Sequence, residues 1–216
     1  MKKSKRWRVA QYFEAQWWRN YLKNKDVDSY LTWKKKYWAG VLQQIETNVK
    51  PAEGMKILDA GCGPAGIFIA LQPHEVTAID PLLAQYAQDL THFNPAMYPY
   101  VEFETIALEN FERNGIFDLV FCLNAINHVS DLKTAFLQLY NSTKKGGKLI
   151  VSIDAHNYRL FKQLFRLQPA DILHPHQYDL KEYGEMLTNL GCTIVQTVLL
   201  KREFLFNHYL LVARKD

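Results

Sequence analysis

The feature that most constrains this chain is the stretch from Ile57 to Asp80. An apolar run leads into the glycine-rich residues 59–66 (Asp-Ala-Gly-Cys-Gly-Pro-Ala-Gly), and a second apolar run ends in Asp80. This order predicts a strand, a tight turn, a helix and another strand, because glycines let the backbone turn sharply and approach a ligand closely. Asp80 lies 19 residues after Gly61, where a carboxylate can accept both hydroxyls of a ribose. The sequence therefore predicts a βα unit that binds a nucleoside.

Asp59 adds a second constraint, because it lies two residues before the first glycine. The spacing G-x-G-x-x-G occurs in nicotinamide, flavin and adenosylmethionine sites alike, so it does not choose between them. A carboxylate at this turn would repel the pyrophosphate of a dinucleotide, whereas it would attract a ligand with an ammonium and a sulfonium group. We therefore expect a cationic nucleoside ligand, with Asp59 near its ammonium group.

The acid-x-Gly-x-Gly pattern resembles the first motif of the class I S-adenosylmethionine-dependent methyltransferases, and the resemblance extends from about Met55 to the C-terminus. It implies S-adenosylmethionine as the cofactor, S-adenosylhomocysteine as the product and a Rossmann-like fold. It also implies cofactor contacts on the loops that follow the first four strands, at Asp59, Ala60, Gly61, Cys62, Gly63, Gly66, Asp80, Pro81, Leu108, Glu109, Leu123 and Asn124.

The rest of the chain predicts alternating strands and helices, which is typical of a doubly wound α/β fold. Strands are expected near residues 55–60, 75–80, 100–106, 117–122 and 146–153, and helices near 65–71, 82–93, 131–144 and from Asp179 to Gly191. Asp179 and Glu182 have the spacing of a capping box. The last two strands, 193–200 and 204–213, are joined by three residues, which is too short for a parallel crossover. We therefore predict a mostly parallel seven-stranded sheet that ends in an antiparallel hairpin.

One segment departs from the family pattern. After the third strand, Ala107-Leu108-Glu109 occupies the place where the family often has Asp-Ala-Glu, so the usual aspartate contact to the adenine amino group is missing. The backbone of Leu108 remains able to bind adenine. For Glu109 a cofactor contact and a plain surface position are equally good interpretations.

Three histidines are candidates for deprotonating an acceptor, because a neutral imidazole can take up a hydroxyl proton near neutral pH. His128 follows the fourth strand, His156 follows the fifth, and His176 lies in the long connection 157–178. For His128 we favour a structural histidine bonded to a neighbouring carbonyl, and plain loop positions are the alternative for the other two. His174 and His176 are two residues apart around a proline, without a pair of carboxylates, so we predict no metal site.

The N-terminal 50 residues hold all the tryptophans of the chain, which are Trp7, Trp17, Trp18, Trp33 and Trp38. Phe13, Trp17 and Tyr21 recur every four residues, which predicts a helix, and a second helix is expected to begin at the capping segment 26–29. Trp17 and Trp18 are adjacent and cannot share one helix face. We interpret residues 1–50 as a helical lid over the cofactor and acceptor of a domain at 51–216, and a simple packing seam is the alternative.

Composition and charge bound the remaining possibilities. The chain has 216 residues, 48% of them hydrophobic, which suits one folded domain, and no apolar run is long enough to span a bilayer. Cys62, Cys122 and Cys192 are isolated, which favours reduced thiols and a cytoplasmic location. The net charge is +4, and five Lys or Arg residues lie in the first eight positions. We interpret these basic residues either as a frayed tail or as an arm that binds the phosphates of a nucleic acid. Asn124 is followed by Ala-Ile rather than Pro-Pro, which argues against nucleic acid as the substrate.

Together these features predict an S-adenosylmethionine-dependent methyltransferase that acts on a small molecule by in-line methyl transfer. Two alternatives stay open. One is a nicotinamide-dependent Rossmann oxidoreductase, against which Asp59 and the terminal hairpin argue. The other is a non-catalytic, methyltransferase-like binding module, which the altered segment at Ala107 permits. The sequence leaves the acceptor, the methylated atom and the oligomeric state open.

Overall fold

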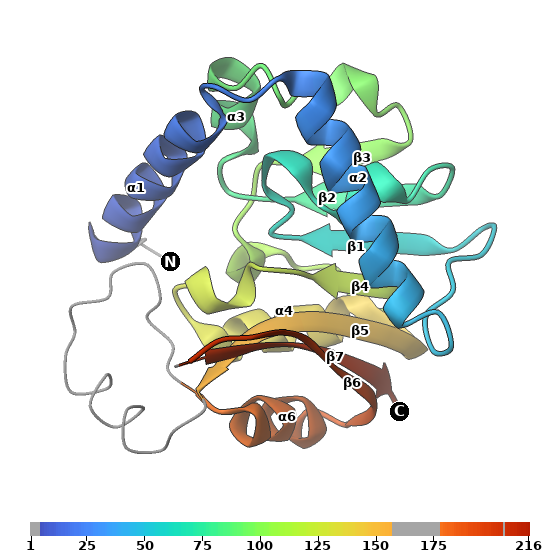
Figure 1. Ribbon diagram of the computed structural model, residues 1–216. Helices are drawn as coiled ribbons and strands as arrows, with labels where there is room; N and C mark the ends of the chain where they lie inside the picture. The colour runs from blue at the N-terminus through green and yellow to red at the C-terminus, as the bar shows by residue number, and fades with distance from the viewer. Residues whose placement is uncertain (1–4, 157–177, 205) are drawn as a thin grey trace.

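Figure 1 shows the computed structural model, which describes residues 5–156, 178–204 and 206–216. Its strands are β1 (Lys56–Ala60), β2 (Glu75–Ile79), β3 (Val101–Glu104), β4 (Phe117–Cys122), β5 (Thr143–His156), β6 (Cys192–Arg202) and β7 (Phe206–Lys215). Its α-helices are α1 (Lys5–Leu22), α2 (Val27–Gln44), α3 (Leu83–Asp89), α4 (Leu132–Ser142) and α6 (Leu180–Asn189). Short 3₁₀ helices are η1 (Gly63–Ala65), η2 (Ile67–Ala70), η3 (Pro95–Met97), η4 (Leu108–Asn110) and η5 (Ile126–His128).

The strands form one seven-stranded sheet in the order β3-β2-β1-β4-β5-β7-β6. Neighbours among β1 to β5 pair in parallel, whereas β7 is antiparallel to both β5 and β6. The capping box also forms, because the Asp179 carboxylate accepts from the Glu182 N–H and the Glu182 carboxylate accepts from the Asp179 N–H. The predicted doubly wound, mostly parallel sheet with a terminal hairpin is therefore confirmed.

The predicted helix at 65–71 is wrong in detail. Two 3₁₀ turns, η1 and η2, replace it, and Gly66 between them is extended, with φ −73° and ψ −174°. A residue with extended backbone cannot lie inside an α-helix. The chain after the glycine turn therefore forms two short 3₁₀ helices separated by an extended residue rather than one continuous helix.

Apolar side chains on both faces of the sheet form the core. Along β1, Ile57 belongs to the cluster on one face and Leu58 to the cluster on the other, as the alternation of strand side chains requires. The first face is covered by α2, the short turns η1 and η2, and α3, and the second face by α4 and α6. The sheet is thus buried from both sides, which is the usual arrangement for parallel strands.

The two N-terminal helices differ in how they attach to this core. α2 is integral to it, since Tyr30, Trp38 and Val41 are buried and Trp38 Nε1 donates a hydrogen bond to the Ala65 carbonyl at 2.9 Å. Asp26 caps α2 by accepting from the Ser29 N–H, as predicted. α1 lies beside the ends of the strands (Figure 1) and adds Ala15 and Leu22 to the core. Its Arg19 also forms an ion pair with Asp89 of α3 at 2.6 Å. In the part of the chain that the structure describes, no helix combines the length and the apolar character needed to cross a membrane.

Candidate cofactor and acceptor site

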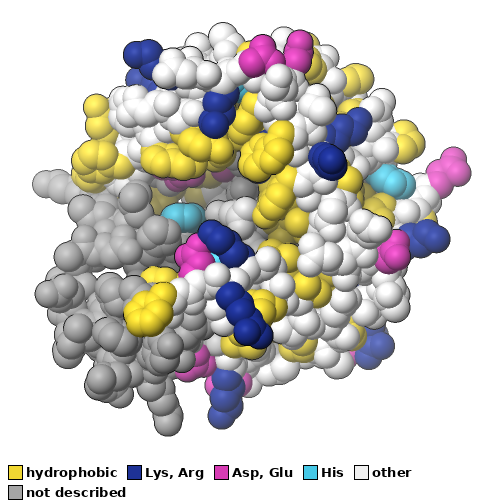
Figure 2. All heavy atoms as spheres, viewed as in Figure 1, with side chains coloured by type: hydrophobic (Ala, Val, Ile, Leu, Met, Phe, Trp, Pro, Cys, Tyr) yellow, Lys and Arg dark blue, Asp and Glu magenta, His cyan; other side chains and the backbone are white. Residues whose placement is uncertain are grey.

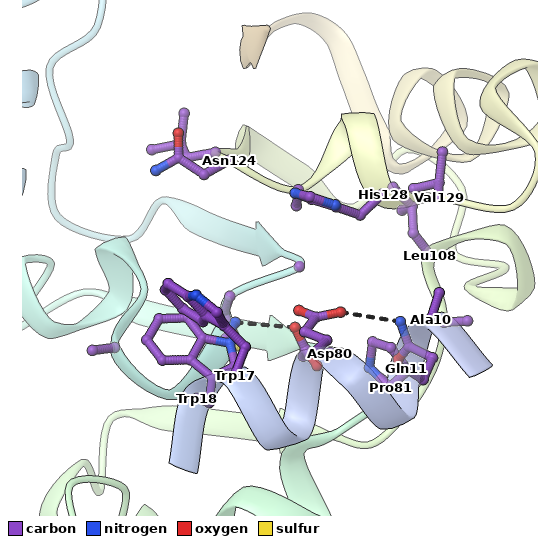
Figure 3. Close-up of a pocket in the computed structure, with 18 of the residues that line it drawn as sticks. Ala10, Gln11, Trp17, Trp18, Asp80, Pro81, Leu108, Asn124, His128 and Val129 are labelled. Atoms are coloured by element: carbon purple, nitrogen blue, oxygen red, sulfur yellow. Dashed lines mark hydrogen bonds between the residues drawn. The ribbon is translucent and has the colours of Figure 1, made fainter. Parts of the chain in front are cut away.

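A cavity of about 550 Å³ opens at the carboxyl ends of the parallel strands. Its walls come from the glycine turn after β1, the loops after β2, β3 and β4, and the helices α1 and α2. This position is where ligands bind in doubly wound sheets, and the volume lies in the range of small-molecule sites. Figure 3 shows Asn124 and His128 on one side of the cavity, facing Trp17, Trp18 and Asp80 across it.

The glycine turn is held in a shape that only glycine allows at Gly61. Its N–H donates to the Ile79 carbonyl at 2.7 Å, and its φ of +71° is a left-handed conformation. A Cβ at this position would lie 2.3 Å from the Cβ of Ala125, in the loop after β4. The absence of a side chain therefore lets two cavity loops touch each other.

Asp59 does not lie where we expected it. Its side chain is 1% exposed and does not line the cavity, and its Oδ2 atom accepts a hydrogen bond from the Phe68 N–H at 3.0 Å. A Cβ on Gly66 would lie 2.4 Å from this oxygen, so the glycine leaves room for the carboxylate under the turn. Burial raises the pKa of Asp59 to about 7. The visible role of Asp59 is to hold the glycine turn against η2.

Asp80 lies in the cavity with both carboxylate oxygens fixed by backbone groups. Oδ1 accepts from the Leu82 N–H at 2.8 Å and Oδ2 accepts from the Gly63 N–H at 3.1 Å. The second bond ties the end of β2 to the glycine turn. Burial raises the pKa of Asp80 to about 6. A carboxylate has about four acceptor positions, so two remain for hydroxyl groups of a ligand.

Helix α1 adds a second carboxylate that the sequence analysis missed. Glu14 lines the cavity, and its Oε2 accepts from Gln11 Nε2 at 3.1 Å. Burial and the negative charge of Asp80 raise the pKa of Glu14 to about 7. Gln11, Glu14 and Trp18 follow the i, i+3, i+7 spacing of one helix face. Gln11 and Glu14 are polar residues on an otherwise apolar face, and this pattern could have identified Glu14 from the sequence.

All five tryptophans line the cavity, together with Tyr21 and Tyr30. Their rings form a continuous series of contacts: Trp17 meets Trp18 at 4.8 Å and stacks on Tyr21 at 4.8 Å, Tyr21 meets Tyr30 at 6.2 Å, and Tyr30 meets Trp33 at 5.9 Å. We call this series the aromatic wall. Trp38 is 4% exposed, whereas Trp17 and Trp33 are more than half exposed. Trp38 thus packs in the core, as the packing-seam alternative expects, and the helical lid stays a prediction.

Lys34 on α2 is a second residue that the sequence analysis missed. Among the described residues it is the one Lys or Arg side chain that lines the cavity. Its Nζ lies 4.4 Å from the Trp38 ring and 5.4 Å from the Tyr37 ring. Burial lowers the pKa of Lys34 to about 8, and the negative charge of Asp59 opposes that shift. A half-buried ammonium group held by aromatic rings is a candidate for binding an anion.

The loop after β3 supplies the apolar side of the cavity. Ile106, Ala107 and Leu108 line it, and Val129 lies nearby on the loop after β4. Glu109 also lines the cavity, but its Oε1 accepts from the Ser130 N–H at 2.6 Å and from the Ser130 hydroxyl at 2.7 Å. Glu109 therefore joins the loops after β3 and β4.

The loop after β4 carries Leu123, Asn124 and His128 into the cavity. Asn124 has a left-handed backbone, with φ +56°, and its N–H donates to the Ser152 hydroxyl at 2.6 Å. His128 is half-buried at the end of η5. Of the three candidate bases, His128 is the one that the structure places in the cavity.

Of the other two candidate histidines, the structure describes His156 alone. His156 is buried outside the cavity, and its ring packs on Phe206 with centroids 4.4 Å apart. Its neighbour Asp154 forms an ion pair with His208 on β7. His176 lies outside the described residues. Of the predicted cofactor residues, Gly61, Cys62, Gly63, Asp80, Pro81, Leu108, Glu109, Leu123 and Asn124 line the cavity, whereas Asp59, Ala60 and Gly66 do not.

Comparisons with known proteins agree with this geometry. The family model for the methyltransferase domain matches residues 30–197. The ubiquinone biosynthesis O-methyltransferase of Rickettsia prowazekii is 30% identical over 114 residues, which are 52% of this chain and 45% of that protein. The chain thus spans about half the length of the curated relatives it matches.

Solved structures show the same fold at low sequence identity. The magnesium protoporphyrin IX methyltransferase of Synechocystis PCC 6803, solved with bound SAH, superposes with a TM-score of 0.65 at 18% identity, covering 99% of this chain and 100% of that one. The 1,6-didemethyltoxoflavin-N1-methyltransferase of Burkholderia thailandensis gives a TM-score of 0.59 at 17% identity, covering 95% and 89%. Because the family model covers more than half of the sequence, this chain belongs to the methyltransferase domain family.

Proposed function

We propose that this protein transfers a methyl group from S-adenosylmethionine to a small-molecule acceptor bound in the cavity. The observation that carries the proposal is Asp80, a buried carboxylate at the end of β2 whose two oxygens are held by Leu82 and Gly63. It stands beside a glycine turn at the carboxyl edge of the sheet, in a chain of the methyltransferase domain family. A fold that binds no nucleoside would not need a carboxylate held beside a glycine turn at this edge of the sheet.

The donor set fits this cofactor. Asp80 keeps acceptor positions for two ribose hydroxyls, and Gly61 and Gly63 line the cavity without side chains that would block it. Ile106, Leu108 and Val129 offer an apolar slot for a planar base. The aromatic wall and two carboxylates give the cavity an environment that suits a cation. When bound, S-adenosylmethionine supplies a methyl group activated by a positively charged sulfur.

Lys34 is the residue to which we assign the carboxylate of the cofactor. Its ammonium group lies over Trp38, which is hydrogen-bonded to Ala65 of the glycine turn. In this assignment the positive charge would serve the amino-acid end of the cofactor, and Asp80, which lines the same cavity, would serve the ribose. A carboxylate there would offset the cost of burying Lys34 as a cation.

The acceptor is best described as a small aromatic or otherwise planar molecule. Rings of the aromatic wall offer faces for stacking, and they exclude water from the methyl-transfer path. His128 lines the same cavity, and we assign it the role of taking a proton from an acceptor hydroxyl. The Rickettsia relative is named for O-methylation in ubiquinone biosynthesis, and a hydroxylated ring as acceptor agrees with both features.

We further propose that α1 is the movable part of the N-terminal lid. α2 is held by larger buried side chains such as Trp38, which is also hydrogen-bonded to Ala65, whereas α1 adds the smaller Ala15 and Leu22 to the core and lies at the edge of the cavity. A lid of this kind would close over bound cofactor and acceptor. The expectations of a cytoplasmic location and of no nucleic-acid substrate stay predictions.

Calorimetric titration with S-adenosylmethionine, S-adenosylhomocysteine and NAD tests the proposal. We expect binding of the first two and none of NAD, followed by methyl transfer to a member of a panel of phenols and catechols. Binding of NAD alone would support the oxidoreductase alternative and overturn the proposal. Cofactor binding with no transfer to any acceptor class would favour the non-catalytic binding module.

A further inference from the structure

One side of α1 carries an exposed apolar stripe. Val9, Phe13, Trp17 and Tyr21 follow one another at intervals of four, so they are neighbours along one side of the helix. Their side chains are 44, 50, 53 and 37% exposed. A helix that only packs against its own core would keep such residues on the buried side. The exposed stripe therefore needs a partner other than the core of this chain.

The exposed apolar residues of the molecule are concentrated at this place. Of the ten large hydrophobic side chains found exposed among the described residues, seven belong to α1 and α2, and Tyr12, Trp33 and Tyr37 extend the stripe. Figure 2 shows hydrophobic side chains gathered over these helices, beside a hollow in the surface. Scattered single apolar residues are ordinary on a protein surface, whereas a contiguous group marks an interaction site.

The same part of the chain is strongly basic. Residues 1–44 contain eleven Lys or Arg and three Asp or Glu, whereas the remaining 172 residues contain fifteen and nineteen. Two of the three acidic groups are engaged, Glu14 in the cavity and Asp26 as the cap of α2. Lys25 lies 4.5 Å from the Tyr21 ring, and Lys36 is exposed on α2. Positive charge and exposed aromatic rings thus share one surface.

We propose that α1, with the exposed Trp33, Lys36 and Tyr37 of α2, docks this protein on an anionic membrane surface. Aromatic side chains with Lys and Arg around them are typical of helices that lie in the interface plane of a bilayer, with the apolar side in the headgroup region. Val9 has neither a hydrogen-bonding group nor a ring that could stack on a base, so it suits acyl chains better than a nucleic acid. The charge excess of residues 1–44 complements acidic lipid headgroups.

The docking surface is continuous with the cavity. Trp17, Tyr21 and Trp33 belong both to the exposed stripe and to the cavity lining. On a membrane the mouth of the cavity would face the lipid, so an acceptor dissolved in the bilayer would reach it without crossing water. This last step rests on the proposed function, whereas docking itself does not.

Co-sedimentation with phosphatidylcholine vesicles, with and without phosphatidylglycerol, tests the docking. The unmodified chain is expected to bind the anionic vesicles, to bind them less at high salt, and not to bind the neutral vesicles. The double variant Tyr12→Ser/Phe13→Ser removes apolar contact at two residues that do not line the cavity. The double variant Lys25→Glu/Lys36→Glu reverses two charges and should weaken binding at least about tenfold.

Matched controls change the same residue types elsewhere. Met97→Ser/Leu137→Ser removes exposed apolar side chains, and Lys133→Glu/Lys145→Glu reverses two exposed charges, all far from α1 and α2 in sequence. Both controls should bind vesicles as the parent protein does. The proposal would be overturned if the controls lost as much vesicle binding as the test variants, or if the parent chain did not bind vesicles. Binding of RNA in preference to vesicles would also overturn it. Titration of every variant with S-adenosylmethionine separately tests the proposed function and confirms folding.

Discussion

Replacing Gly61 by alanine tests whether contact between two cavity loops depends on the missing side chain. The new Cβ would lie 2.3 Å from the Cβ of Ala125, and the left-handed φ of +71° would also be strained. The backbone strain costs roughly 1–2 kcal/mol and the overlap a further 1–3 kcal/mol or so. We expect Gly61→Ala to lower the free energy of unfolding by about 2–5 kcal/mol.

The chain offers a control that separates the two contributions. Gly54 has a similar φ of +77°, but a Cβ there meets no atom within 4 Å. Gly54→Ala should therefore show the strain without the overlap and cost roughly 1–2 kcal/mol. Ala125→Gly removes the other atom of the overlap, so Gly61→Ala/Ala125→Gly should recover much of the stability that Gly61→Ala loses.

Urea denaturation followed by circular dichroism measures all four variants. In the double-mutant cycle we expect a favourable coupling of about 1–3 kcal/mol between positions 61 and 125. A coupling within the usual error of about 0.5 kcal/mol would refute the reasoning, because the two substitutions would then act independently. Equal losses for Gly61→Ala and Gly54→Ala would lead to the same conclusion.

Four further predictions concern the cavity. The raised pKa of Glu14 means that the folded protein holds this proton more tightly than the unfolded chain, so the free energy of unfolding falls as pH rises from about 4.5 to about 7. Glu14→Gln should therefore stabilise the protein by up to roughly 3 kcal/mol at about pH 8 and have little effect at about pH 4. Urea denaturation measures this, with the exposed Glu46→Gln as the control. An equal effect at both pH values would contradict it. Asp80→Ala should weaken S-adenosylmethionine about ten- to a hundredfold in calorimetry, and unchanged affinity would place the ribose elsewhere. Lys34→Met should weaken S-adenosylmethionine at least about tenfold while adenosine, which lacks the carboxylate, binds as before; equal weakening of both ligands would remove Lys34 from the amino-acid end. Deleting residues 1–24 should leave a folded sheet domain that still binds adenosine but has lost methyl transfer, and full transfer by the truncated protein would exclude α1 as a lid.

Much of the fold could be predicted from local sequence because its signals act over short distances. The apolar runs around residues 59–66 define β1 and β2, and the three residues joining the last two strands permit only an antiparallel hairpin. Asp26 and Asp179 cap their helices through bonds that reach three residues along the chain. Asp80 in the cavity followed from the rule that ligands bind at the carboxyl ends of parallel strands.

The tertiary structure decided which side chains meet. Asp59 had the right spacing for a ligand contact, but the extended backbone at Gly66 leaves its carboxylate under the turn, on the Phe68 N–H. His156 ends a strand like a site residue, yet β7 packs Phe206 against it. Glu14 and Lys34 reach the cavity only because α1 and α2 dock beside the strand ends, and nothing in their local sequence encodes that long-range packing. The sequence thus determined the sheet and the carboxylate at its edge, while the docking of two helices determined the charges that face it.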